Sequence, residues 1–207
     1  MVTTRLVLVR HGESEWNAQG RLQGQGGTAL SALGRRQSEA LAAYLERRFV
    51  HFHLVVTSDL QRAVQTAQPW LSRVPMPVRV DTRWREVDVG TWSGLTWAEV
   101  QDQDPQRYAA WRDGEDVRRG GGETFAEFRV RTAAAMETLR DTDGTVLVFT
   151  HGGSVRFAVA AALGLPPMGE RTLAPVHNCS VTEIVLGPDG PSLASYNLHD
   201  HLAGVGG

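Results

Sequence analysis

The chain has 207 residues, of which 42% are hydrophobic and 21% charged, and its formal net charge is -2. These values are typical of one globular domain, spanning residues 1–207, that is long enough to bury a good core. The small net charge gives no reason to expect nucleic acid or an anionic membrane as a partner. All 21 basic residues are arginine, which excludes lysine chemistry.

Cys179 is the only cysteine, so no intrachain disulfide is possible, as in proteins of a reducing cytoplasm. The first ten residues lack the apolar core of a signal peptide. No apolar run approaches the roughly 20 residues that cross a bilayer. The sequence therefore predicts a cytoplasmic protein without a membrane partner.

Two apolar runs each end in a histidine. Leu6-Val7-Leu8-Val9 reads as a buried strand, and Arg10-His11-Gly12 follows it directly. A second run at residues 145–149 leads to Thr150-His151-Gly152-Gly153. In open α/β sheets, ligands bind beyond the carboxyl ends of the strands. Both histidines are therefore expected at the same edge of one sheet.

Between these runs, a polar, glycine-rich loop at residues 13–30 leads to a helix that Ser31 caps and that runs to about residue 48. A short strand follows at residues 54–57. Ser58-Asp59 is predicted to cap the next helix, which runs to about Gln68 and is disturbed at Pro69. Arg62 falls in the first turn of that helix, where an anion is readily held, although alone it reads equally as a surface arginine.

A third strand at residues 78–81 precedes a loop with two candidate acid/base residues, Glu86 and Asp88, whose alternative role is pairing with Arg83 and Arg85. Short helices at 97–103 and 105–111 and a polar connection at 112–122 come next. A long amphipathic helix then runs to about residue 139, and its aromatic residues, Phe125 and Phe128, read as core rather than ligand contacts. The region 81–142 is predicted to form a lid-like insertion over the active edge.

The last predicted elements are an apolar helix at 153–163 and two strands at 181–186 and 192–196. A Gly-Pro-Asp-Gly turn joins the strands, so they form an antiparallel pair near a sheet edge, which could pair across a homodimer. The order of elements predicts an α/β fold: a layered α/β/α domain with a mostly parallel mixed sheet and helices on both faces.

Arg10, His11, Arg62 and His151 all follow strand ends, and they suit phosphoryl transfer: arginine forks bind phosphate, and imidazole is a competent nucleophile at phosphorus. No carboxylate cluster suggests a metal cage, and chelation by His199-Asp200-His201 is the weaker reading of that tail. Walker and Gly-x-Ser-x-Gly motifs are absent from the sequence.

Leu8-Val9-Arg10-His11-Gly12-Glu13-Ser14-Glu15-Trp16-Asn17 resembles the signature of the histidine phosphatase superfamily, in its phosphoglycerate-mutase-like branch. The similarity continues over nearly the whole chain. The other motifs are residues 22–24, 30–37, 57–67, 85–86, 90–96, 122–125 and 150–153.

The resemblance implies that His11 is the phosphorylated nucleophile and that Arg10, Arg62 and His151 bind the phosphoryl group. It implies that Glu86, rather than Asp88, is the general acid/base. Three further residues are placed on the phosphate or leaving-group side: Asn17, Gln23 and Gly152. It implies neither a metal nor an organic cofactor, and a small-molecule phosphomonoester as substrate.

Two departures from the family pattern stand out. Gly26-Gly27-Thr28-Ala29 replaces a segment that often holds aspartate and proline, and Ser93 stands where glutamate is common; both are expected to lie outside the phosphate pocket. The tryptophans at 16, 84, 92, 97 and 111 offer aromatic surface near the expected mouth, although several could simply pack the insertion, Trp111 above all. The sequence predicts a phosphatase, with a phosphoglycerate mutase and a non-catalytic phosphate-binding module as alternatives.

Overall fold

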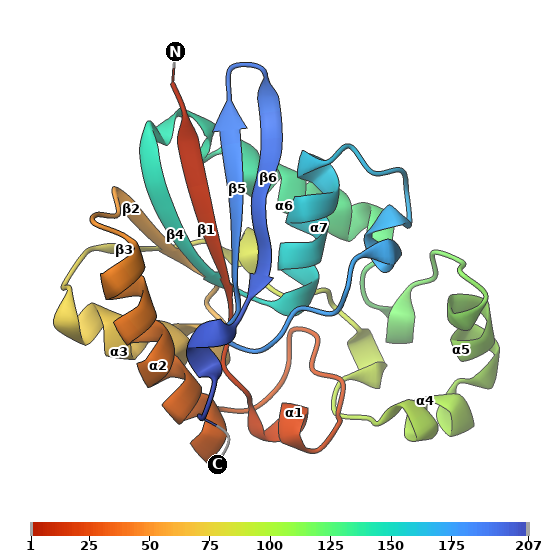
Figure 1. Ribbon diagram of the computed structural model, residues 1–207. Coiled ribbons are helices and arrows are strands. Elements are labelled where there is room, and N and C mark those ends of the chain that lie inside the picture. The colour runs from red at the N-terminus through yellow and green to blue at the C-terminus, as the bar shows by residue number, and fades with distance from the viewer. Residues whose placement is uncertain (1, 206–207) are drawn as a thin grey trace.

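The computed structural model describes residues 2–205 of the chain, and its strands and helices alternate through most of that range (Figure 1). The strands are β1 (Thr4–Arg10), β2 (Leu54–Thr57), β3 (Val78–Val80), β4 (Gly144–Thr150), β5 (Val181–Gly187) and β6 (Gly190–Leu198). The helices are α1 (Glu15–Ala18), α2 (Ala32–Arg48), α3 (Gln61–Arg73), α4 (Trp97–Gln103), α5 (Pro105–Arg112), α6 (Phe125–Glu137) and α7 (Gly152–Ala162).

The strands form one sheet in the order β3-β2-β4-β1-β5-β6. β1 and β4 pair in parallel at its centre, and β2 and β3 continue in parallel on one side. β5 and β6 run antiparallel on the other side, and β6 forms that edge of the sheet. The predicted mixed sheet with a late antiparallel pair is confirmed.

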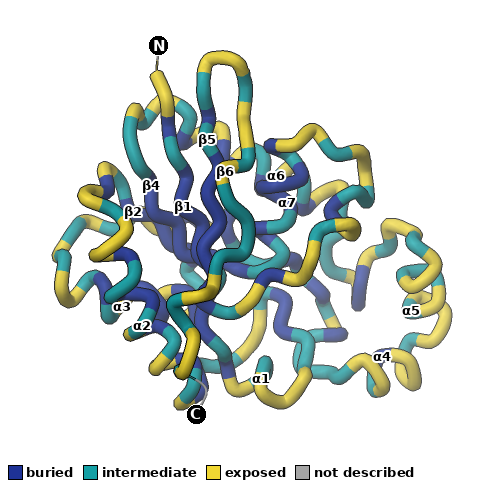
Figure 2. Tube along the Cα trace, in the orientation of Figure 1, coloured by how far each residue is buried: buried dark blue, intermediate teal, exposed yellow. Residues whose placement is uncertain are grey.

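Alternate residues of the central strands face opposite layers of helices, as the two-residue period of a strand requires. Leu6 and Leu8 of β1 pack into a cluster with α6 and α7. Val7 and Val9 pack into a second cluster with α2 and α3. All four residues are fully buried, and Figure 2 shows the buried colour concentrated along the central strands. The layered α/β/α class is therefore confirmed.

A third, small hydrophobic cluster joins the region 81–142 to Phe157 of α7 and includes Trp92, Val100 and Phe128. The helices α4 and α5 of this region lie away from the sheet in Figure 1 and are largely exposed in Figure 2. That this region forms a lid-like insertion over the active edge stays a prediction, as does homodimer pairing through the late strands.

The structure corrects the prediction for α3 at both ends. The helix begins at Gln61, after its expected caps Ser58 and Asp59, and no side chain caps it. Ser58 Oγ contacts His151 and accepts from the N–H of Leu60, and Asp59 pairs with Arg85. It also runs past Pro69 to Arg73. Trp70, buried against the ring of Phe52, anchors the turn after the proline, so packing outweighs the backbone hydrogen bond that proline removes. The short helix α1, inside the predicted loop at 13–30, was not predicted.

Among residues 2–205, no helix combines the length and apolar character needed to span a bilayer.

Candidate active site

His11 and His151 lie side by side at the carboxyl ends of two neighbouring parallel strands. β1 and β4 pair so that Arg10 stands opposite Thr150, and each histidine is the next residue along its chain. The centroids of the two imidazole rings are 5.2 Å apart, and both side chains are buried. The two apolar runs thus bring both histidines to one edge of the sheet, as the sequence predicts.

The neighbours of His11 fix its tautomer. Its Nδ1 lies 2.7 Å from the carbonyl oxygen of Gly12, which can only accept, so the ring proton is on Nδ1. Its Nε2 accepts a hydrogen bond from Arg62 Nε at 3.2 Å. Burial, followed by the charges of Arg62 and Arg10, lowers the pKa of His11 well below its ordinary value. At neutral pH the imidazole is therefore uncharged, with its lone pair on Nε2.

Arg62 reaches His11 from the first turn of α3, and two carbonyl groups hold its guanidinium. Nη1 donates to the oxygen of Gly26 at 2.6 Å, and Nη2 donates to that of Gly24 at 2.7 Å. Burial lowers the pKa of Arg62 to about 10, so the group stays charged at neutral pH. As expected, neither residues 26–29 nor Ser93 line the cavity, but the segment is coupled to it through the bond between Gly26 and Arg62.

Two buried nitrogens beside His11 lack a hydrogen-bond partner within the described residues: Arg10 Nε and His151 Nδ1. Arg10 is oriented by a bond from Nη1 to the carbonyl oxygen of Val176. His151 is oriented by Ser58 Oγ, 2.9 Å from its Nε2. Leaving a buried polar group unsatisfied costs about 1–3 kcal/mol, so these atoms indicate a site completed by a ligand rich in oxygen. Sequence analysis missed Ser58 because it reads as a helix cap.

Glu86 lines the same cavity from the segment after β3, and backbone groups hold its carboxylate. Oε2 accepts from the N–H of Gly153 at 2.9 Å, and Oε1 accepts from the N–H of Val87 at 2.9 Å. Asp88 does not line the cavity, and its Oδ1 accepts from the N–H of Gly90 at 2.8 Å. Of the two carboxylates singled out in the sequence, only Glu86 is placed to reach a ligand.

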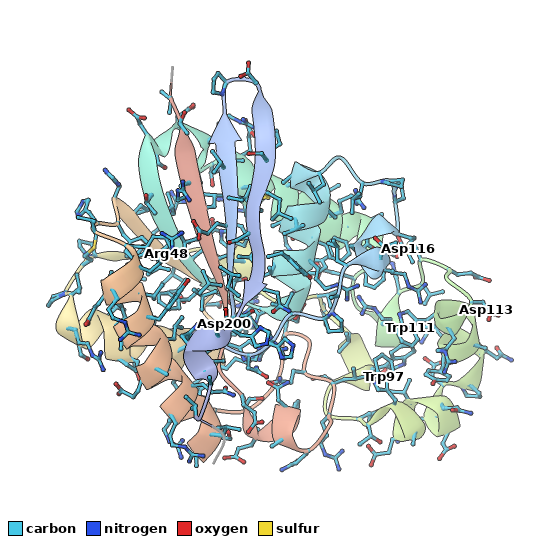
Figure 3. All side chains as sticks on the ribbon, viewed as in Figure 1. Arg48, Trp97, Trp111, Asp113, Asp116 and Asp200 are labelled. Atoms are coloured by element: carbon cyan, nitrogen blue, oxygen red, sulfur yellow. The ribbon has the colours of Figure 1, made fainter. Side chains whose placement is uncertain are left out.

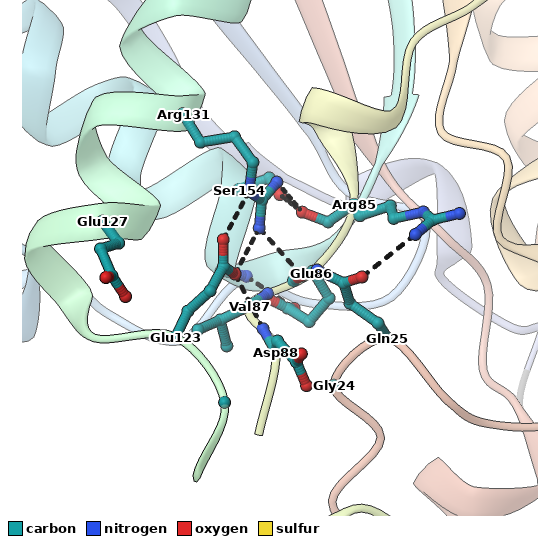
Figure 4. A network of polar contacts seen from close by, with 12 residues as sticks. Gly24, Gln25, Arg85, Glu86, Val87, Asp88, Glu123, Glu127, Arg131 and Ser154 are labelled. Atoms are coloured by element: carbon teal, nitrogen blue, oxygen red, sulfur yellow. Dashed lines mark hydrogen bonds and ion pairs between the residues drawn. The ribbon is translucent and has the colours of Figure 1, made fainter. Parts of the chain in front are cut away.

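Arg131 of α6 holds the backbone around Glu86, as Figure 4 shows. Its Nη1 donates to the carbonyl oxygens of Arg83 at 2.7 Å and Arg85 at 3.0 Å, and its Nη2 donates to that of Glu86 at 3.2 Å. The same guanidinium makes a two-pronged ion pair with Glu123, at 2.8 and 2.7 Å. Glu86 is therefore fixed by contacts to both α6 and α7.

Arg83 and Arg85 do not pair with Glu86 or Asp88, which corrects the alternative drawn from the sequence. Arg83 pairs with Asp81, and Arg85 pairs with Asp59.

Asn17 and Gln23 also line the cavity. Ser14 donates its backbone N–H to Asn17 Oδ1 at 3.2 Å and its hydroxyl to Gln23 Oε1 at 2.9 Å. These bonds engage the oxygens, so the amide NH₂ groups are the ends available to a ligand. Gly152 does not itself line the cavity: it is the first residue of α7, and a Cβ there would stand 3.3 Å from Arg10 Nε.

The cavity has a volume of about 380 Å³ and extends over residues to which the sequence analysis gave no role in the site. These additional lining residues are Arg21, Leu22, Gly24, Val87, Val89, Arg119, Gly153, Arg156, Phe157, Glu170 and Arg171. The added charged groups are mostly cationic, so the electrostatic character of the phosphate end continues into the rest of the cavity.

Several aromatic residues have roles other than those predicted. Phe128 is fully buried in a hydrophobic cluster, as the sequence pattern predicts, and also borders the cavity. Phe125 is only partly buried and lines the cavity, although the same pattern assigns it to the core. Trp111 lines it too, although it is the tryptophan that the sequence analysis most favours as packing. Trp84 and Trp92 are fully buried, so they offer no surface at the mouth.

Within residues 2–205, no three His, Cys, Asp or Glu side chains cluster as metal ligands do. In the segment at 199–201, the two histidine rings have separate contacts. His199 stacks on His177 with centroids 4.1 Å apart, whereas His201 stacks on Tyr44 and donates from Nε2 to the carbonyl oxygen of Cys179.

Comparison with known proteins places this geometry in a family. A model of the histidine phosphatase superfamily (branch 1) matches residues 6–199. Glucosyl-3-phosphoglycerate phosphatase of Mycolicibacterium vanbaalenii is 37% identical over 193 residues, covering 89% of this chain and 85% of that protein. Metal-independent phosphoserine phosphatase of Arabidopsis thaliana is 33% identical over 210 residues, covering 98% of this chain and 85% of that protein. The solved structure of mycobacterial glucosyl-3-phosphoglycerate phosphatase matches with a TM-score of 0.84 at 33% identity, covering 95% of this chain and 100% of that one.

The chain belongs to the histidine phosphatase superfamily, branch 1, as the resemblance in its motifs implies. Within that family it is a phosphatase, a hydrolase of phosphoric monoesters.

Proposed function

We propose that the chain hydrolyses small phosphomonoesters in two steps, through a phosphohistidine on His11 and without a metal ion. The observation that carries the proposal is the state of His11: a neutral imidazole with Nε2 unprotonated and next to the Arg62 guanidinium. The unpartnered nitrogens of Arg10 and His151 supply further donors for phosphoryl oxygens. The cavity also gives an organic group room beside them.

In the first step, His11 Nε2 attacks phosphorus and the bond from phosphorus to the ester oxygen breaks. Arg10, Arg62 and His151 stabilise the charge on the three remaining phosphoryl oxygens, which is the main task in this chemistry. Glu86, in its protonated form, gives its proton to the departing oxygen, so the leaving group departs as an alcohol.

In the second step, Glu86 is a carboxylate and accepts a proton from water. The resulting hydroxide attacks phosphorus, the bond between phosphorus and His11 Nε2 breaks, and Nε2 regains its lone pair. Inorganic phosphate leaves, and Glu86 is protonated again for the next turnover. Asn17 and Gln23 present their NH₂ groups to the phosphate or to the leaving group.

The substrates named for two relatives, glucosyl-3-phosphoglycerate and phosphoserine, are both small phosphomonoesters that carry a carboxylate. We propose that the substrate of this chain is likewise a small phosphomonoester. A mutase would have to retain a bisphosphorylated intermediate and shield the phosphohistidine from water, and this chain has no lysine with which to grip one.

The test measures phosphate release from a panel of phosphomonoesters in the presence of EDTA, with labelling by ³²P-substrate in parallel. The wild-type protein is expected to release phosphate and to retain ³²P on the chain when the reaction is stopped without acid, because acid hydrolyses phosphohistidine. His11→Ala is expected to lose both, whereas His51→Ala, which changes an exposed histidine, should keep both. Full activity of His11→Ala would refute the mechanism. Isomerisation of phosphoglycerate without phosphate release would favour a mutase.

A further inference from the structure

Arg119 has a buried guanidinium that makes no hydrogen bond or ion pair within the described residues. The residue is only 7% exposed, and its Nη2 lacks a partner. Burial lowers its pKa to about 10, so it remains charged at neutral pH. Its guanidinium carbon lies over the ring of Phe125, 4.2 Å from the ring centroid. The carboxylates of Glu86, Asp116 and Glu123 act on its charge without forming an ion pair with it. A buried cation without a direct partner is costly, so its retention here requires a reason.

The backbone around Arg119 is built so that this side chain stays at the cavity wall. Arg119 begins a 3₁₀ turn, and the next residue, Gly120, has a φ of +56°. A Cβ on Gly120 would stand 2.6 Å from the N–H nitrogen of Trp92, so the two segments pack backbone to backbone. Such packing is open only to glycine and fixes where the arginine enters the cavity.

Other unpartnered polar atoms belong to residues that line the same cavity. Among the described residues, the buried atoms Arg156 Nε, Trp111 Nε1 and Glu170 Oε1 have no hydrogen-bond partner. Trp111 is held flat against Trp97, with centroids 4.4 Å apart, and Figure 3 shows the pair on the inner side of α4 and α5. Together with Arg119 Nη2, these atoms offer three donors and one acceptor.

Most arginines outside the cavity form an ion pair with a carboxylate, whereas most of those that line the cavity form none within the described residues. Six arginines line the cavity, at positions 10, 21, 62, 119, 156 and 171. Within residues 2–205, Arg21 alone of these six pairs with a carboxylate, that of Glu99. Arg10 and Arg62 belong to the phosphate end, next to His11. The positive charge of Arg119 and Arg156 is therefore left for another part of the ligand.

We propose that Arg119, with Arg156 Nε and Trp111 Nε1, binds a carboxylate on the organic group of the substrate. This rests on the proposed function, because it assumes that the phosphoryl group occupies the end near His11. A carboxylate opposes the positive charge of Arg119, and its two oxygens suit the planar fork of the guanidinium. The carboxylate oxygen Oε1 of Glu170 would repel a doubly charged second phosphate bound here. It can instead accept a hydrogen bond from a hydroxyl group of the substrate.

The test compares two substrates that differ in one group. The substrate 3-phosphoglycerate carries a carboxylate where glycerol 3-phosphate carries a hydroxymethyl group. Wild type is expected to prefer 3-phosphoglycerate in kcat/KM. Arg119→Gln is expected to reduce that preference by about 10- to 100-fold, as expected for loss of one charge-assisted hydrogen-bonded contact. Arg119→Lys keeps the charge without the fork and should retain part of the preference.

Arg118→Gln is the matched control, because Arg118 lies on the same turn, is exposed and pairs with Glu127 outside the cavity. It should leave both rates and their ratio unchanged. An equal loss on both substrates in Arg119→Gln would overturn the carboxylate subsite, as would a preference for a bisphosphate that depends on Arg119. Failure of wild type to hydrolyse 4-nitrophenyl phosphate, which has no carboxylate, would instead count against the proposed function.

Discussion

A Cβ atom on Gly153 would overlap the carboxylate oxygen Oε1 of Glu86, at a separation far below 3.0 Å. The same glycine donates its backbone N–H to Oε2 at 2.9 Å. Gly153 lies in the first turn of α7, where the helix dipole favours a carboxylate. The absence of a side chain at residue 153 is thus what lets Glu86 approach the helix and lie in the cavity beside His11.

Gly153→Ala is expected to displace Glu86 and to lower kcat by about 10²- to 10⁴-fold, the usual contribution of a positioned general acid/base. The loss should be larger for alkyl phosphates than for 4-nitrophenyl phosphate, because nitrophenolate leaves with little need of a proton. Steady-state kinetics on both kinds of ester measures this difference. Gly187→Ala is the control, since a Cβ there would meet nothing closer than 3.8 Å. Equal losses on both kinds of ester would contradict a displaced acid.

The phosphate end of the site was predictable because its residues follow directly from the periodic parts of the chain. His11 and His151 each follow a buried apolar run, and the pairing of β1 with β4 then sets them side by side. The pattern of apolar runs in the sequence is enough to predict this proximity, since the carboxyl ends of parallel strands lie at one edge of the sheet.

The rest of the cavity could not be predicted in this way. Arg118 and Arg119 are adjacent and chemically identical, yet the first pairs with Glu127 at the surface and the second is buried. Which of them faces the cavity depends on how Gly120 packs against the turn at residues 90–92, a contact between distant segments. Phe125 was likewise misassigned, because helical periodicity marks an apolar face without saying whether protein or ligand covers it.

Arg62→Lys tests whether the arginine fork matters beyond its charge. The guanidinium makes three bonds, to His11 Nε2 and to the oxygens of Gly24 and Gly26, and a lysine ammonium cannot reproduce that planar arrangement. We expect kcat/KM to fall by at least about 10²-fold and inhibition by inorganic phosphate to weaken, in line with the loss of a positioned charge stabiliser. Arg79→Lys, at an exposed position on β3, should change neither quantity. Near wild-type kinetics in Arg62→Lys would mean that charge alone suffices.

Arg131→Met tests how strongly one side chain holds the segment around Glu86. Only 18% of the Arg131 side chain is exposed, and removing it takes a donor from the Glu123 carboxylate and from three carbonyl oxygens. Among the described residues, the Glu123 carboxylate keeps only the backbone N–H of Asp88, and the Arg85 oxygen keeps only the Ser154 hydroxyl. We expect the free energy of unfolding in urea to fall by about 3 kcal/mol. Arg140→Met breaks the more exposed pair with Glu137 and should cost less than about 1 kcal/mol. Equal losses in the two variants would argue against the bracing role of Arg131.

The two buried histidines predict that the protein without phosphate is destabilised by mild acid. The pKa values of His11 and His151 are both lowered well below 6.5 by burial first and by the nearby Arg62 charge second. Between the unfolded and folded pKa values, the unfolded chain binds protons that the folded protein does not, so stability falls as the pH drops below about 6.5. Each histidine contributes up to about 1.4 kcal/mol per pH unit in that range. Urea unfolding between pH 7.5 and pH 5 should therefore show a shallower dependence for His151→Gln than for wild type. His51→Gln, which alters an exposed ring, should follow wild type, and identical slopes for all three proteins would mean that the buried imidazoles are not held neutral.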